Sequence, residues 1–468
     1  MRALRKAPGA RRGAREGGGS ATADYGKTAS FLAIGVGLTG VITYVYFFIA
    51  SHVLSKPDYG EITVVWSAVF ITISTLYRPV EQLLSRHISE HLVKGEPIGG
   101  TTRNAATIQL GLALLFAALA LAFRGPLQDG LLEGNETLYW VYFSAVLFYA
   151  ASYFARGYLA GVKRFGLFTA LILSESCFRT LFAVLVAVSL LSGQSWVAIG
   201  IVAAPSLSLM VVPLAFARRA RRAPEPAQGT EGDASVSMAH GTGFAAAVLV
   251  IMFSEQAFLN AGPLVVRALD DAEAAGFIFN VLMLARAPLQ LFQAVSTSIL
   301  PHLTGLHTSE EPGSENEFHR SVRAVLVGIA AFTGVMALTI LVAGPQLMQL
   351  AFSDKFSYER GELLLVALGT GLYLSSVTVN QACVAQGQVR RAAARWIACA
   401  ALFIGWNFVP LVGDEFLRVE IGFTLSAAVL LGLLYLIYRR PHERAEDVPA
   451  PGSPEELELR LAAVDENT

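Results

Sequence analysis

Long apolar segments recur along almost the whole chain, and short polar stretches separate them. Each apolar run is about 18 to 25 residues long, which is enough for a helix to cross a hydrocarbon core of about 30 Å. The pattern predicts an all-α, polytopic membrane protein with about twelve spans. The predicted spans cover residues 29–52, 62–84, 105–123, 138–160, 169–191, 196–216, 244–268, 276–303, 322–343, 362–386, 392–412 and 419–438.

The composition agrees with this pattern. Hydrophobic residues make up 54% of the chain and charged residues 15%, whereas about 25% of the residues in soluble domains are charged. The three cysteines, Cys177, Cys383 and Cys399, lie in apolar runs and lack the spacing of a metal site or a disulfide framework. We therefore expect no soluble domain, no metal, no cofactor and no nucleic-acid partner.

A polar segment at 218–243 divides the predicted spans into six and six. Most of the 35 Lys and Arg residues fall in segments that are cytoplasmic if the N-terminus is cytoplasmic. We therefore expect a multi-pass protein of the cytoplasmic membrane with both ends in the cytoplasm. The predicted organisation is a disordered basic tail at 1–24, an N-terminal lobe at 25–217, a linker at 218–243, a C-terminal lobe at 244–440 and a disordered tail at 441–468.

The two halves show a weak internal repeat. One constant shift along the chain places Gly60 on Gly276 and the predicted span 105–123 on 321–339. Internally repeated halves are the plan of many secondary transporters, which bind their substrate between the repeats. The sequence therefore predicts two six-helix lobes around a central cavity.

Polar side chains form stripes on several of the predicted spans. In the span 276–303 they recur at i, i+4, i+7 and i+11, which is one face of a helix, and the same shift finds polar residues on the matching face of 62–84. A polar stripe inside a membrane faces a hydrated cavity or a polar partner rather than lipid. The predicted cavity residues are Arg286, Gln290, Gln293 and Thr297, then Ser74, Arg78 and Glu81, and Gln256 and Asn260 in the span 244–268.

Two more charges lie within the predicted span 169–191. Glu175 and Arg179 are four residues apart, in the order that favours an ion pair on a helix. We interpret them as a structural ion pair; the alternative is a direct role in handling substrate or ions.

Glu255 and Arg286 lie deep in adjacent predicted spans. They either neutralise each other, or Arg286 attracts an anionic head group and Glu255 binds a proton or cation. We predict the second arrangement, with Glu255 as the candidate site of ion coupling.

Two stretches resemble a known family. "LSKPDYGEITVVWSAVFITISTLYRPVEQLLSRHISEHLVKGE" at 54–96 and "FARGYLAGVKRFGLFTALILSESCFRT" at 154–180 are similar to polysaccharide flippases of the multidrug/oligosaccharidyl-lipid/polysaccharide exporter superfamily. The resemblance implies two lobes that open alternately to the two sides and a lipid-linked sugar as cargo. It also implies a proton or sodium ion for coupling and polysaccharide-biosynthesis enzymes as partners within the lipid bilayer.

Other functions stay open at this point. A multidrug exporter of the same superfamily shares the predicted architecture. A membrane glycosyltransferase or polymer ligase needs acidic residues on a substantial outer loop, and the predicted outer loops are short, with Asp270 and Asp271 as adjacent acids. A scaffold without transport activity is the remaining alternative. The favoured prediction is a transporter and not an enzyme.

Overall fold

The computed structural model describes residues 34–211, 213, 238–284 and 314–439 of the chain. The described N-terminal part consists of helices Ile34–Val53, α2 (Lys56–Leu76), α3 (Arg78–Lys94), α4 (Gly99–Ala122), α5 (Glu136–Gly161), α6 (Phe165–Ala187) and α7 (Gln194–Ser208), with a π-helical turn η1 (Pro126–Leu131) and a 3-10 turn η2 (Leu209–Val211). We call residues 34–211 the N-lobe.

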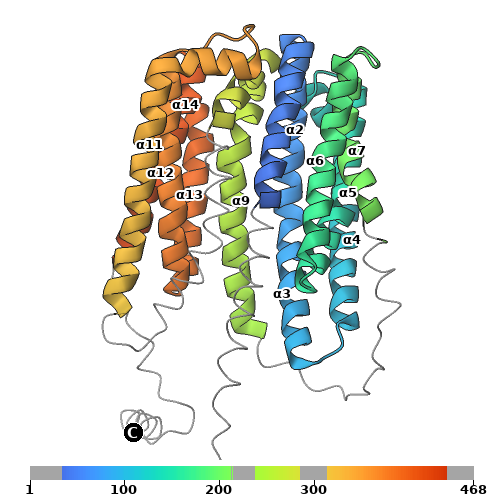
Figure 1. The fold of residues 1–468 in the computed structure, drawn as a ribbon, viewed down its shortest axis with the longest axis vertical. Helices are drawn as coiled ribbons and strands as arrows, with labels where there is room; N and C mark the ends of the chain where they lie inside the picture. The colour runs from blue at the N-terminus through green and yellow to red at the C-terminus, as the bar shows by residue number, and fades with distance from the viewer. Residues whose placement is uncertain (1–33, 212, 214–237, 285–313, 440–468) are drawn as a thin grey trace, which may run out of the picture.

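The described C-terminal part is also helical. It consists of α9 (Met238–Leu269), the short helix Ala272–Leu284, α11 (Ser314–Phe352), α12 (Arg360–Ala385), α13 (Val389–Asn407) and α14 (Glu415–Tyr438). We call 238–284 and 314–439 the C-lobe. Figure 1 shows the two lobes side by side, the N-lobe in blue to green and the C-lobe in yellow-green to red.

The prediction of an all-α, multi-pass membrane protein is confirmed. Within the described ranges, ten helices are long and apolar enough to cross a membrane. Every predicted span coincides with a helix, although the span 276–303 can be followed only to Leu284. The predicted second span is α2 followed directly by α3, with the break at Tyr77, two residues before Pro79. The proline explains the break, because it cannot donate a backbone hydrogen bond within the helix.

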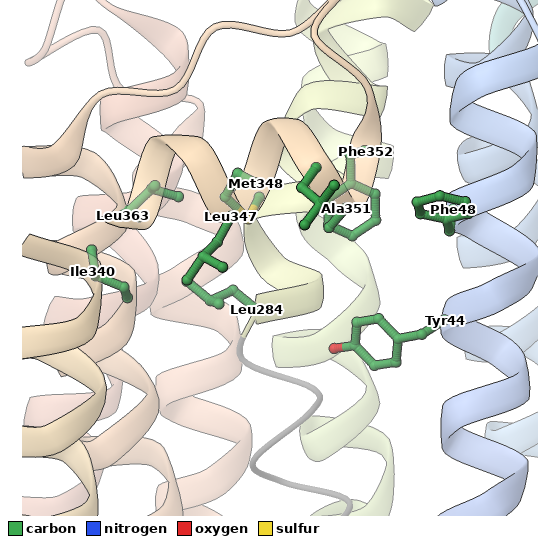
Figure 2. A pocket seen from close by; sticks show the side chains of 11 residues that line it. Tyr44, Phe48, Leu284, Ile340, Leu347, Met348, Ala351, Phe352 and Leu363 are labelled. Atoms are coloured by element: carbon green, nitrogen blue, oxygen red, sulfur yellow. The ribbon is translucent and has the colours of Figure 1, made fainter. Parts of the chain in front are cut away.

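Several boundaries differ from the sequence prediction; α3, for example, continues to Lys94, beyond the predicted end at 84. The helix α9 begins at Met238, inside the segment predicted as linker. The helix α11 extends to Phe352, well past the predicted end at 343, and contains Pro345. Figure 2 shows the residues after Pro345 running across the view at a large angle to the helices beside them. Proline bends a helix without necessarily ending it, so the apolar segment after it remains helical.

The lobes are joined at the end of the molecule where α2 begins, at the top of Figure 1. Gly60 of α2 packs so closely on the helix Ala272–Leu284 that an added Cβ would lie 1.7 Å from the carbonyl oxygen of Ala272. A Cβ on Gly276 would lie 3.0 Å from the Cα of Gly60. The two glycines that the internal repeat aligns are therefore in contact with each other, and only glycine permits this close helix crossing.

Polar contacts hold the same end together. Lys56 pairs with Glu273 at 2.8 Å, and Arg267 pairs with Glu133 at 3.1 Å. The Tyr59 hydroxyl donates to the Asn280 side-chain oxygen, which adds a buried bond between the lobes. In this structure the lobes are therefore closed against each other at this end.

Candidate functional site

The interior of the N-lobe holds a buried ion pair between α5 and α6. The Glu175 carboxylate accepts hydrogen bonds from the Arg156 guanidinium and from the Ser152 hydroxyl. The Glu175 side chain is 4% exposed and that of Arg156 15%. Ser152 and Arg156 are one turn apart on α5, so both reach the same carboxylate. The Arg156 guanidinium also lies 4.6 Å from the ring centre of Tyr153.

The expected pair between Glu175 and Arg179 is therefore corrected: Glu175 pairs with Arg156. Arg179 instead lies 4.4 Å from the ring centre of Trp66 and donates to the Ser176 hydroxyl at 3.2 Å. Both choices have a physical reason. Arg156 reaches Glu175 from the facing helix, and an aromatic face attracts a desolvated guanidinium strongly. Arg179 thus attaches α6 to α2 rather than neutralising its neighbour on the same helix.

The helix α3 brings two more charges to this cluster. Glu81 lies close enough to Arg156, Arg78 and Glu175 to interact with all three electrostatically. The approach is possible because Gly157 of α5 packs on the backbone of Glu81, where an added Cβ would lie 2.7 Å from its carbonyl oxygen. Arg78, Glu81 and Arg156 are each partly exposed although they lie within membrane-spanning segments. Charged groups in this position face water or polar partners rather than lipid.

Glu255 connects this cluster to the C-lobe. It lies on α9, is partly exposed, and interacts electrostatically with Arg78 of α3. Tyr373 of α12 lies near both groups. Arg78 therefore sits between the N-lobe cluster and the carboxylate of the other lobe. Arg286, which the sequence analysis considered as a partner of Glu255, lies outside the described residues.

The remaining predicted cavity residues differ in their environments. The Asn260 side chain donates to the Gln256 side-chain oxygen at 3.0 Å, and both residues are almost fully buried. Ser74 is buried as well, and its side chain lies close to that of Tyr153. These polar groups stabilise helix packing in the present conformation. The predicted stripe of Arg286, Gln290, Gln293 and Thr297 lies outside the described residues.

The sequence analysis missed two charged residues of the interior. It did not name Arg156, which lies near the end of its predicted span and pairs with Glu175 on the next span, beside Ser152. It also missed Glu420 of α14, which is fully buried and has no hydrogen-bond partner for either carboxylate oxygen among the described residues. Its place in the second turn of a predicted span was the signal.

An apolar cavity of about 480 Å³ lies between the lobes. Figure 2 shows Tyr44 and Phe48 of the first helix on one side, and Leu347, Met348 and Phe352 of α11 on the other. The segment that follows Pro345 thus forms one wall of the cavity. This wall is apolar throughout, in contrast to the charged surface around Arg78.

Comparisons with known proteins identify the fold. No protein-family model and no curated protein match the sequence. Among solved structures, an inward-facing multidrug resistance MATE family transporter of the MOP superfamily matches with TM-score 0.58 and 12% identity over 94% of this chain and 99% of that one. An outward-facing structure of such a transporter gives 0.61 and 12% over 94% and 97%. A MATE transporter from Vibrio cholerae gives 0.55 and 16% over 88% and 97%.

These matches cover nearly the whole length of both chains. They agree with the superfamily fold that the resemblance implied and give no support for its polysaccharide flippase branch. Sequence identity this low carries the fold alone. This chain is a polytopic helical membrane protein with the two-lobed fold of the MATE transporters.

Proposed function

We propose that this protein is an alternating-access transporter of the multidrug type, which moves amphiphilic organic molecules through the space between its lobes. The observation that carries this proposal is the position of Arg78 and Glu255, two partly exposed opposite charges on facing lobes within the membrane. Similarity to a transporter fold known in inward-facing and outward-facing conformations supports it.

The contacts between the lobes suggest how the cycle runs. Opening the closed end requires Lys56 to leave Glu273 and Arg267 to leave Glu133. The Lys56–Glu273 pair is half-exposed and contributes about 0–1 kcal/mol, so it presents a small barrier. The Arg267 side chain is only 12% exposed, so its pair with Glu133 costs more to separate. At Gly60 the backbones of the two lobes are in direct contact.

Glu255 is the proposed site of ion coupling. Its described counter-charge is on the other lobe, so a relative movement of the lobes separates Glu255 from Arg78. A carboxylate in that position is costly without a compensating charge, and a proton or sodium ion can supply one. Binding of the ion therefore favours the conformation in which the two residues are apart.

The charged surface also suggests the chemistry of the substrate. Arg78 and Arg156 alternate there with Glu81 and Glu255, so the surface offers partners for a cation, an anion or a zwitterion. The apolar cavity between the first helix and α11 offers space for a hydrophobic part. An amphiphilic molecule with at least one charged group matches this combination.

Efflux from proteoliposomes tests the proposal. Purified protein is reconstituted with a panel of fluorescent amphiphilic cations and zwitterions under an imposed proton or sodium gradient. We expect gradient-driven efflux that Glu255→Gln abolishes, whereas Glu90→Gln, which changes an exposed acid on α3, leaves it intact. Failure of every compound and gradient, with folded protein in the vesicles, would contradict the multidrug function.

A second candidate is translocation of a lipid-linked oligosaccharide. The apolar cavity between the first helix and α11 favours it, because a hydrocarbon chain fits that wall while Arg78 and Arg156 meet a phosphate. The partners would then be lipid-linked sugars and polysaccharide-biosynthesis enzymes. A fluorescent lipid-linked sugar, accessible to external quencher only after translocation, distinguishes this candidate from the first.

A further inference from the structure

A second cavity, of about 580 Å³, lies within the N-lobe between α4 and α5. On α4 it is lined by Ala106, Ala113 and Ala117, which are seven and four residues apart and so share one helix face. Three alanines and four larger residues of α5, together with Leu209 of η2, line most of the rest. Small side chains on both helices therefore create a groove, and the exposed Leu110 and Leu114 form its rim on the membrane side.

Two residues with polar side-chain atoms, Gln109 and Tyr158, line this groove. Gln109 is 4% exposed and donates its Nε2 to the carbonyl oxygen of Ala150 at 2.8 Å. Its other polar atom, Oε1, is buried and has no hydrogen-bond partner in the part of the chain that the structure describes. A buried acceptor without a donor is unfavourable. A ligand with a hydrogen-bond donor at this position would satisfy the acceptor.

At the equivalent positions of the C-lobe, larger residues stand in place of two of these alanines. The shift that aligns the two halves places Gln109 on Val325, Ala113 on Ile329 and Ala117 on Thr333 of α11. Ile329 and Thr333 are buried, and Thr333 packs where a Cβ on Gly371 of α12 would lie 2.2 Å from its hydroxyl. Larger side chains thus pack between α11 and α12 at positions where α4 has alanines. The groove of the N-lobe therefore depends on its small side chains.

The dimensions and charges of the groove identify its ligand. From Ala106 to Ala117 the helix rises about 16 Å, which is about half of a hydrocarbon core of about 30 Å and hence one leaflet. Arg103 is exposed one turn before Ala106, and the exposed Lys163 follows the end of α5 at the same end of the groove. Basic side chains at the membrane surface attract anionic head groups.

We propose that this groove binds one hydrocarbon chain of an anionic membrane lipid, whose phosphate lies at Arg103 and whose hydroxyl or amide group donates to Gln109 Oε1. The site is separate from the charged surface between the lobes, which α5 meets with its other face through Ser152 and Arg156. The proposal stands independently of the proposed transport function.

Photolabelling tests this site in the full-length protein. The probe is lysophosphatidylglycerol with a photoreactive group at mid-chain, because it has one chain, a phosphate and a free hydroxyl near the glycerol. The protein is placed in phosphatidylcholine nanodiscs, and labelled peptides are identified by mass spectrometry. We expect labelling of α4 and α5 that saturates with probe concentration.

Matched variants locate the label. Ala106→Trp and Ala117→Trp fill the groove and should remove the labelling, whereas Ala118→Trp, at an exposed position of α4 outside the groove, should preserve it. Gln109→Leu and Arg103→Gln should each weaken apparent affinity about fivefold, the effect of one hydrogen bond or one surface charge. Lysophosphatidylcholine should compete poorly.

Two results would overturn the proposal. Labelling that the groove-filling tryptophans leave unchanged, in variants that remain monodisperse, would show that the probe lies elsewhere. Equal competition by lysophosphatidylcholine, together with no effect of Arg103→Gln, would exclude a site for an anionic lipid.

Discussion

The interiors of the two lobes handle buried charge differently. In the N-lobe, Glu175 is neutralised by Arg156 from a helix of the same lobe, and Arg179 rests on an aromatic ring of that lobe. In the described C-lobe, Glu255 finds its basic neighbour in Arg78 of the other lobe. Glu420 lies near two other acids, Glu362 and Asp414.

This difference indicates which charged side chains change their electrostatic energy when the lobes move. A charge whose partner belongs to the same rigid body keeps that partner when the lobes move. A charge whose partner lies on the other body loses it, and its energy then depends on the state of the transporter. On this account the N-lobe cluster is chiefly structural, whereas Glu255 responds to the opening and closing of the lobes.

The largest expected effect comes from breaking the N-lobe pair. Arg156→Met leaves the Glu175 carboxylate buried without a counter-charge and should destabilise the fold by about 3–5 kcal/mol. Chemical or thermal unfolding in detergent measures the loss. Adding Glu175→Gln to Arg156→Met should restore most of the stability. Arg86→Met breaks the exposed pair with Glu90 and serves as the control, with an effect of about 0–1 kcal/mol.

A double-mutant cycle tests whether Glu175 pairs with Arg156 or with Arg179. The coupling energy between Glu175 and Arg156 should be large, and that between Glu175 and Arg179 should be within about 0.5 kcal/mol of zero. Arg179→Met alone should cost about 2 kcal/mol through the lost contact with Trp66. A strong coupling between Glu175 and Arg179 would instead support the ion pair within α6 that the sequence predicted.

The sequence could predict most of the fold because each apolar run must form a helix to satisfy its backbone in lipid. The end of α11 was missed, since Pro345 and the glutamines after it resemble the start of a loop, yet the proline only bends the helix. The repeat was informative at one place in particular: Gly60 and Gly276, aligned by the sequence alone, proved to touch each other.

The candidate site could be predicted only in part. Charges such as Glu175 and Arg78 are conspicuous because they interrupt apolar runs. Their partners were not predictable, because pairing across helices depends on how closely those helices approach. The contact of Gly157 with the backbone of Glu81 brings α3 and α5 together. The local sequence of neither helix predicts this contact.

A smaller effect is expected at the crossing between the lobes. Gly60→Ala adds a methyl group that overlaps the carbonyl of Ala272, so it should destabilise the closed end by about 1–3 kcal/mol. Disulfide trapping between Lys56→Cys and Glu273→Cys reports how often that end is closed, and trapping should slow in the Gly60→Ala background. Gly37→Ala, where an added Cβ meets nothing within 4 Å, should leave trapping unchanged.

The central claim is that the lobes move apart at the closed end and that Glu255 responds to this movement. The most direct measurement is the distance between spin labels at the exposed positions Asp129→Cys and Asp270→Cys in a Cys177→Ser background, recorded in nanodiscs by pulsed electron paramagnetic resonance. The account predicts a short and a long distance, with populations that pH or sodium shifts and that Glu255→Gln makes insensitive to the ion. A single distance, unchanged by ions and by Glu255→Gln, would contradict it.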